Sequence, residues 1–166
     1  SVEDVPEWRV RTPLQRTCQL LKRHRDIYFS ADADLQPVSI IITTLAARSY
    51  RGEGWIVDAL RNVLANMANY IERRNDKWWI ANPADPQENF ADKWNETPEK
   101  AKRFYGWLEA AKRDFEGLIA SKSLEEQRTR AGSMLRPSER IQKASVSNGE
   151  LTPLVPALVE SVPGPA

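Results

Sequence analysis

The chain has 166 residues, of which 41% are hydrophobic, and a formal net charge of +1 at pH 7. This length and apolar content suffice for one domain with a buried core, and they exclude a wholly disordered chain. Because acidic and basic residues almost balance, bulk charge does not indicate a nucleic-acid-binding protein.

A first helix is predicted to begin at Thr12. Thr12, Pro13 and Gln15 have the pattern of an N-cap, a first helical residue and a reciprocal capping partner. An inner stripe then recurs at helical spacing, formed by Leu14, Cys18, Leu21, Arg25 and Tyr28. Lys22 lies beside this stripe, where a lysine can hold its ammonium at the edge of the core and meet a phosphate. The alternative is a basic helix whose cations are simply solvated.

Residues 37–50 form a very hydrophobic segment with conflicting signals. The β-branched residues between Val38 and Thr44 favour a strand, whereas the length, the Ala46-Ala47 pair and the lack of alternation favour a buried helix. We predict the helix, with Ser39 in its first turn. Free amides, the helix dipole and a hydroxyl favour an anion at that position. The alternative role for Ser39 is that of a helix cap.

Two further helices are predicted, at residues 55–72 and from Thr97 onward. Between them, a polar turn at residues 73–77 leads into a short apolar run at residues 78–80, which we expect to be extended. A group of aromatic residues in or near the fourth helix is assigned to the core rather than to a base-stacking platform. Its members are Trp94, Phe104, Tyr105 and Trp107.

The order and spacing of three features resemble the C-terminal half of oligoadenylate synthetase-like nucleotidyltransferases. The similarity is closest to the bacterial relatives of cyclic GMP-AMP synthase called CD-NTases, and it runs from about Trp8 to Leu118. The features are a helix carrying Leu-Leu-Lys up to Lys22, a hydrophobic helix led by Ser39, and Asn-Pro-Ala-Asp-Pro-x-x-Asn at residues 82–89. In the vertebrate synthetases a similar run follows a short apolar strand.

The resemblance implies a role for each matching residue. Lys22 matches a lysine that contacts the triphosphate of the donor nucleotide, and Ser39 matches a serine that joins it. Several relatives have a base-stacking aromatic residue just after that serine, but this chain has Ile40 there, so base stacking is not expected from that position. The loop residues that we assign to support of the site, rather than to chemistry, are Asn82, Asp85 and Asn89.

One part of the family pattern is missing. Family members hold two metal ions on paired acidic residues that follow a Gly-Ser or Gly-Gly turn in an N-terminal α/β half. The acidic pairs Asp32 with Asp34 and Glu125 with Glu126 do not follow such a turn. The resemblance therefore implies that a missing N-terminal half holds Mg²⁺, that ATP or other nucleoside triphosphates are the substrates, and that this chain alone is inactive.

The sequence thus predicts a mainly all-α fold, a bundle of four to six helices with one short extended segment. We expect a connecting segment at residues 1–11, a helical nucleotide-binding domain at 12–144 and a Pro-rich tail at 145–166. The charged segment 121–140 is expected to continue the fourth helix as an exposed helix that ends near Arg136, before Pro137. The resemblance suggests that a regulatory or ubiquitin-transfer-like protein acts on the C-terminal residue of this tail, Ala166.

Two functions from different classes remain at this point. The parent enzyme makes cyclic di- or trinucleotide signals in anti-phage defence, or the chain is a helical protein-interaction module without a nucleotide role. The single cysteine, Cys18, is expected to be a small buried hydrophobe, and the single histidine, His24, excludes a zinc-ligand cluster. A cytoplasmic setting is expected, with no membrane-spanning stretch and no signal-peptide pattern.

Overall fold

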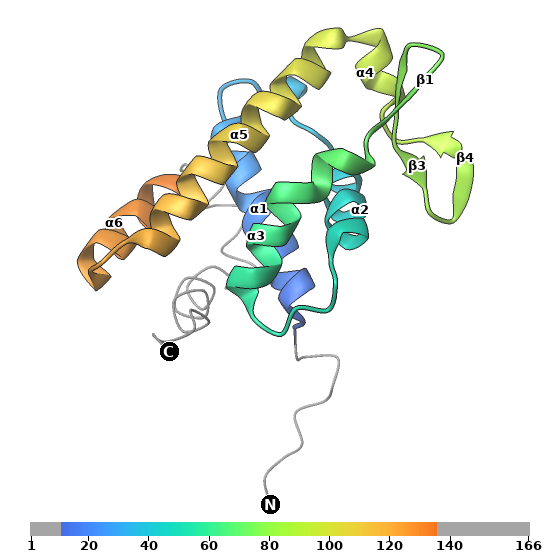
Figure 1. Cartoon of the computed structure of the whole chain (residues 1–166). Coiled ribbons are helices and arrows are strands. Elements are labelled where there is room, and N and C mark those ends of the chain that lie inside the picture. Colours follow the sequence, from blue (N-terminus) through green and yellow to red (C-terminus); the bar gives the residue numbers. More distant parts are fainter. Residues whose placement is uncertain (1–10, 136–166) are drawn as a thin grey trace, which may run out of the picture.

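The structure, a computed structural model, describes residues 11–135 and is mainly helical (Figure 1). The helices are α1 (Pro13–Tyr28), α2 (Ser39–Ser49), α3 (Ile56–Asn66), α4 (Asp92–Glu96), α5 (Pro98–Ala120) and α6 (Leu124–Leu135), with two short 3-10 turns, η2 (Ala33–Leu35) and η3 (Met67–Tyr70). Two separate antiparallel hairpins pair β1 (Glu72–Arg74) with β2 (Lys77–Trp79), and β3 (Ala81–Asn82) with β4 (Asp85–Asn89). The predicted mainly α-helical fold is confirmed.

α1 is the central helix, and it packs against α2, α3, α5 and α6. Its predicted start is confirmed: the Thr12 hydroxyl accepts a hydrogen bond from the Gln15 backbone N–H at 3.2 Å, and the Gln15 side chain accepts one from the Thr12 backbone at 2.9 Å. Because neighbouring helices cover α1 on more than one side, it buries Leu20 and His24 in addition to the predicted stripe. Tyr28, which was expected on that stripe, is 38% exposed.

α2 confirms that residues 37–50 are helical rather than extended. The helix packs against α1, α3 and η3, and it buries Ile41, Ile42 and Leu45. Because these side chains are buried against neighbouring helices, their packing overrides the strand propensity of β-branched residues. Its first turn is open to solvent, because Ile40 in that turn and Val38 just before it are 47% and 56% exposed.

The third predicted helix ends earlier than expected. α3 stops at Asn66 and η3 follows, so Glu72 begins strand β1 instead of ending a helix. Asn75 and Asp76 both have positive φ angles, 50° and 63°, and they form a two-residue turn that brings Arg74 opposite Lys77. Such primed turns match the twist of paired strands. The predicted extended run at residues 78–80 is confirmed in part, since β2 includes its two tryptophans.

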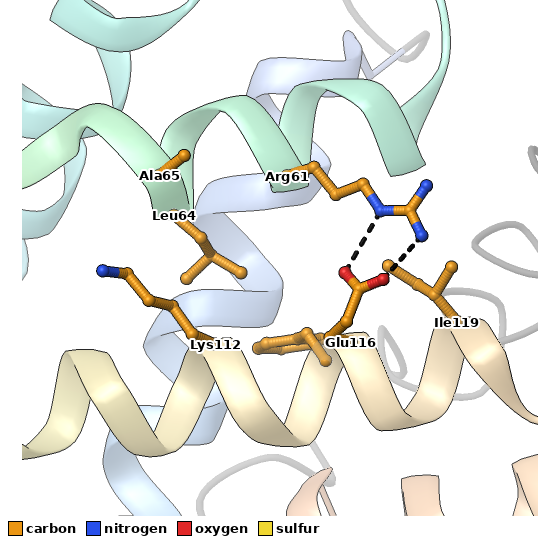
Figure 2. A pocket seen from close by; sticks show the side chains of 7 residues that line it. Arg61, Leu64, Ala65, Lys112, Glu116 and Ile119 are labelled. Atoms are coloured by element: carbon orange, nitrogen blue, oxygen red, sulfur yellow. Dashed lines mark hydrogen bonds and ion pairs between the residues drawn. The ribbon is translucent and has the colours of Figure 1, made fainter.

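α3 and α5 lie side by side and leave a hollow of about 300 Å³ on their outer surface (Figure 2). Leu64, Phe115 and Ile119 contribute its apolar wall. Arg61 and Glu116 cross it with two hydrogen bonds, of 2.7 and 3.2 Å, so the charges of this pair are already matched. Neither Lys22 nor Ser39 lines the hollow.

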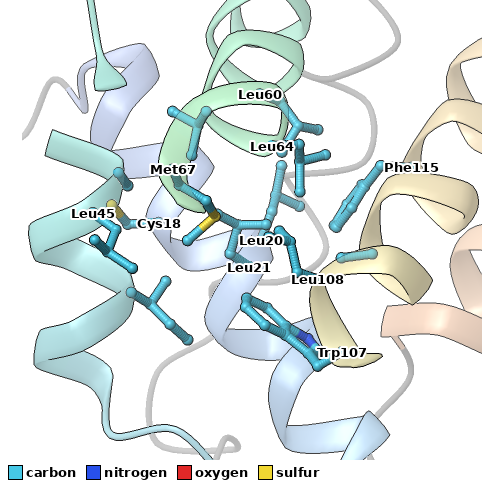
Figure 3. Packing of buried hydrophobic residues seen from close by; sticks show 14 of the residues in the cluster. Cys18, Leu20, Leu21, Leu45, Leu60, Leu64, Met67, Trp107, Leu108 and Phe115 are labelled. Carbon is cyan, nitrogen blue, oxygen red and sulfur yellow. The ribbon is translucent and has the colours of Figure 1, made fainter. Parts of the chain in front are cut away.

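The core is built from α1, α2, α3, α5 and α6, and Figure 3 shows leucines of the first four helices together with Trp107 and Phe115. Phe104 and Trp107 are fully buried, with ring centroids 5.6 Å apart, and the Trp94 ring lies 5.0 Å from Phe104. The assignment of these aromatic residues to the core is confirmed. Tyr105 is half-buried against Trp78, with ring centroids 5.8 Å apart.

The charged segment after α5 is a separate helix rather than an extension of α5. The chain breaks at residues 121–123, and α6 then returns to pack against α1 and α5, where it buries Ala131, Met134 and Leu135. The segment is therefore less exposed than its composition predicted. The described part ends at α6, so residues 136–144 of the predicted domain and the predicted tail lie outside it. No helix within residues 11–135 combines the length and apolar character needed to cross a membrane.

Candidate functional site

Lys22 is half-buried on α1, at the edge of the core. Burial raises the pKa of the Cys18 thiol, one turn earlier on α1, and the positive charge of Lys22 opposes that rise. The ion pairs seen in residues 11–135 use other cations. The charge of Lys22 is therefore not matched by a carboxylate within the described part of the chain.

Ser39 is the first residue of α2 and is exposed. The N-cap position belongs to Val38, and no side chain caps this helix, so the alternative role of Ser39 as a cap is wrong. Its hydroxyl instead accepts a hydrogen bond from Nη1 of Arg25 at 2.9 Å. The side chain of Ser39 therefore bonds to α1 rather than to the backbone of its own helix.

Arg25 joins the end of α1 to the start of α2. The residue is only 7% exposed, and its Nη1 also donates to the backbone carbonyl of Pro37 at 3.0 Å. On its other edge, Nε and Nη2 donate to Oδ1 of Asp26 at 2.9 and 2.8 Å. The alternative of simply solvated cations is thus wrong for Arg25, and its predicted place on the inner stripe is confirmed. An arginine at an inner-stripe position was the available signal, because buried arginines have partners.

The positions of Lys22 and Ser39 are related through Arg25. Lys22 precedes Arg25 by three residues, and side chains at this spacing leave the same side of a helix with Cβ atoms about 5–6 Å apart. The bond from Arg25 to the Ser39 hydroxyl brings the start of α2 to α1, one helical turn from Lys22. That Lys22 and Ser39 face one common ligand stays a prediction. The first turn of α2 adds unpaired backbone N–H groups and the positive end of a helix dipole. This side of the molecule is chemically suited to an oxyanion.

The predicted loop residues form part of the β3–β4 hairpin. Asn89 holds it most firmly: its Oδ1 accepts from the backbone N–H groups of Ile80 and Ala91, both at 2.9 Å, and its Nδ2 donates to the Trp78 carbonyl at 2.8 Å. Asn82 accepts from the backbone of the turn at Ala84, at 2.9 Å. These bonds give the segment a defined shape.

Asp85 makes a more local contact, accepting from the backbone N–H of Gln87 at 3.3 Å. The hairpin meets α2 through Arg48, whose Nη2 donates to the Ala81 carbonyl at 3.0 Å. This contact is at the C-terminal end of α2, away from Ser39. The supporting role of Asn82, Asp85 and Asn89 at a nucleotide site stays a prediction.

The acidic pairs form ordinary surface contacts. Asp32 pairs with Arg103 at 3.1 Å, and Glu126 pairs with Arg130 at 3.1 Å along α6. Within residues 11–135, no group of three or more His, Cys, Asp or Glu side chains is placed to hold a metal ion. The described residues therefore do not fit a metal, and no metal-dependent step is assigned to them.

His24 is the polar centre of the contact between α1 and α5, and sequence reasoning did not identify this role. The ring is 3% exposed; its Nε2 lies 2.7 Å from Oδ2 of Asp114, and its Nδ1 accepts from the indole N–H of Trp107 at 3.0 Å. Since Trp107 only donates, the neutral ring carries its proton on Nε2 and donates it to the carboxylate. Burial lowers the pKa of His24, and the hydrogen bond and charge of Asp114 oppose that shift.

The sequence is similar to a named, curated protein. No family model matches the chain. Over 126 residues, which are 75% of this chain, the sequence is 34% identical to a curated protein of Roseivirga ehrenbergii named c-di-GMP synthase. The chain spans about a third of the length of that relative, 34%. The match supports a relationship to CD-NTase-like enzymes, in agreement with the resemblance of the motifs.

Proposed function

We propose that this chain is the nucleotide-binding helical half of a nucleotidyltransferase that makes cyclic di- or trinucleotide signals in anti-phage defence. The observation that carries the proposal is the bond from buried Arg25 to the exposed Ser39 hydroxyl, one helical turn from Lys22, whose charge no carboxylate within residues 11–135 pairs. The relative named c-di-GMP synthase supports the same class of reaction.

In this proposal, Lys22 and Ser39 bind the triphosphate group of ATP or another nucleoside triphosphate. The ammonium supplies a point charge, and the hydroxyl and the first N–H groups of α2 supply directed donors. Hydrogen bonds to a charged phosphate are stronger than neutral ones, because one partner is ionised. The chain thereby orients the substrate and leaves bond formation to other residues.

The catalytic step itself is assigned to an N-terminal half. Mg²⁺ held there would stabilise the developing charge on the transferred phosphoryl group. Asn82, Asp85 and Asn89 support the cleft through the shape of the β3–β4 hairpin. The chain alone should then bind a nucleotide weakly and form no product.

A regulatory or ubiquitin-transfer-like protein that acts on the C-terminal end is a further proposed partner. This part of the proposal rests on the sequence alone, since residues 136–166 lie outside the described part.

The proposal is tested in the intact protein, with Lys22→Ala and Ser39→Ala as separate variants. Each should weaken binding of a non-hydrolysable nucleoside triphosphate by about tenfold or more, because hydrogen bonds to charged groups contribute roughly 1.5–3 kcal/mol. Product formation should fall as well. Thermal stability should stay nearly unchanged in Lys22→Ala, since Lys22 has no ion pair with a described residue. Ser39→Ala should lose some stability, because buried Arg25 loses one hydrogen-bond acceptor. Calorimetric titration and product chromatography measure the two effects.

Lys102→Ala is the matched control, because it removes the same charge from an exposed site on α5. This variant should bind nucleotide as the parent does. Normal affinity and normal product formation in both Lys22→Ala and Ser39→Ala would reject the nucleotide role. The chain would then fit the alternative of a helical protein-interaction module, with exposed Val38 and Ile40 as part of its contact surface.

A further inference from the structure

Arg25 is buried, yet two of its hydrogen bonds end on the first residues of α2. Nη1 donates both to the carbonyl of Pro37, at 3.0 Å, and to the hydroxyl of Ser39, at 2.9 Å. These bonds hold the entry to α2 and its first side chain against α1. A serine at the start of a helix has several accessible rotamers when nothing holds it. The bond to Arg25 selects one of them.

The same bond determines what the Ser39 hydroxyl can still do. A hydroxyl has one proton and two lone pairs, and Arg25 occupies a lone pair. No hydrogen bond among the described residues uses this hydroxyl as the donor. Its proton therefore remains for a ligand, and the adjacent guanidinium makes it a better donor by polarising the O–H bond.

Arg25 itself is not placed to serve as the ligand-binding cation. The carboxylate of Asp26 accepts from Nε and Nη2 at 2.9 and 2.8 Å, which neutralises the guanidinium locally. The side chain is 9% exposed, so little of it reaches solvent. Lys22, by contrast, has no paired carboxylate in the described part. The two cations thus differ in role: Lys22 offers charge, and Arg25 offers position.

We infer that Arg25 is a positioning residue of the proposed phosphate site, acting through Ser39. It aims the Ser39 hydroxyl at a phosphate oxygen and fixes the first turn of α2, without contacting the nucleotide. This inference rests on the proposed function and adds to it a residue that neither the motifs nor the comparisons identify. Asp26 stabilises the arrangement by holding the other edge of the guanidinium.

A double-mutant cycle in the intact protein tests the inference. The variants are Arg25→Met, which keeps the length but removes every donor, Ser39→Ala, and the two combined. Affinity is measured with a non-hydrolysable nucleoside triphosphate, and KM and kcat with the substrate. Each single change should weaken binding about tenfold, and the combined variant should bind no more weakly than Ser39→Ala alone. The loss should raise KM more than it lowers kcat, because the interaction is with the bound triphosphate.

Arg25→Lys provides a second cycle if Arg25→Met folds poorly. It keeps a buried cation but lacks the planar fork, so it should recover part of the affinity in the presence of Ser39 and none in Ser39→Ala. Unfolding temperatures of all variants separate a loss of folded protein from a loss of affinity.

Two results overturn the inference in distinguishable ways. If Ser39→Ala weakens binding and the Arg25 variants weaken it by the same factor again in the Ser39→Ala background, Arg25 acts independently of Ser39. The inference then fails while the proposed function stands. If neither Lys22→Ala nor Ser39→Ala weakens binding, the proposed function fails first and the inference falls with it.

Discussion

His24 and Arg25 are consecutive residues of α1, both nearly buried, but they serve different contacts. His24 faces α5, where Trp107 and Asp114 use both ring nitrogens. Arg25 faces the start of α2, where its bond to Ser39 leaves that hydroxyl with a proton to donate. We call the α1–α5 contact closed, because both ring nitrogens of His24 have partners, and the α1–α2 contact open, because the exposed Ser39 hydroxyl keeps a proton to donate. The difference between the two contacts is therefore the hydroxyl proton of Ser39, which no described residue accepts.

Removing Trp107 should have the largest effect on stability, because it removes the hydrogen bond to His24 and leaves a cavity in the core. Trp107→Ala is expected to lower the free energy of unfolding by about 3–5 kcal/mol. Trp107→Phe keeps most of the ring but leaves the buried Nδ1 of His24 without a donor, at a cost of about 1–3 kcal/mol. Denaturant unfolding measures both values. A Trp107→Phe variant as stable as the parent would mean that the indole hydrogen bond contributes nothing.

Acid should weaken the closed contact next. The pKa of His24 is lowered in the folded protein, mainly by burial, so below its ordinary value of about 6.5 the unfolded chain binds the proton more readily. The free energy of unfolding should therefore fall as pH drops below about 6.5, with a slope of at most about 1.4 kcal/mol per pH unit, the limit for one proton. Above that pH the imidazole is neutral in both states and contributes no slope.

The chain offers a clean control for this titration, because His24 is its single histidine. Denaturant unfolding should be measured between about pH 7.5 and 5.5. Ordinary carboxyl groups have pKa values near about 4, so they stay ionised in this range and the imidazole is the side chain that titrates. His24→Gln should lose this pH dependence. A slope of the same size in both proteins would assign the effect to another group.

A change at the start of α1 tests whether nucleotide affinity depends on the Arg25–Ser39 contact itself or on the stability of the whole helix. Thr12→Ala removes the capping box and should lower the free energy of unfolding by about 1 kcal/mol. Thr12→Ser should restore most of it. Nucleotide affinity should be unchanged in both variants, as measured by calorimetric titration. A tenfold loss of affinity in Thr12→Ala would show that the open contact depends on the whole helix.

The smallest effect is expected at the exposed ion pair between α3 and α5. The hydrogen bond and charge of Arg61 lower the pKa of Glu116, but both side chains are about half exposed, so water and salt screen the attraction. Arg61→Ala should cost less than about 1 kcal/mol, and added salt should reduce that cost further. Thermal unfolding at low and high salt measures it. A cost that salt does not change would contradict a screened surface pair.

Local signals predicted the helix starts well. The capping box at Thr12 and Pro13, and the Thr97-Pro98 start of α5, depend on residues within one turn of each other, so the sequence contains the whole interaction. The end of α3 was missed because Met67 and Ile71 continue its helical spacing. The turn at Asn75 and Asp76 competes with that spacing, and pairing of β1 with β2 decides the outcome.

The candidate site was predicted only in part. Lys22 and Ser39 were selected by resemblance, and their binding roles stay predictions. Arg25 was assigned to the inner stripe, and its burial there is confirmed, but its partner Ser39 lies 14 residues away, on the next helix. The partners of His24 are farther away still, since Asp114 lies 90 residues later. Periodicity within one helix contains no information on such partners.

The sequence by itself determined where the main helices begin, which aromatic side chains fill the core and which residues resemble a phosphate-binding pair. Those features depend on neighbours within a turn or on the burial of apolar surface, which is not directional. Only the tertiary structure decided that Arg25 holds Ser39 and that His24 faces Trp107 and Asp114. Hydrogen bonds require two groups at a defined distance and angle, and the packing of α1 against α2 and α5 sets that geometry.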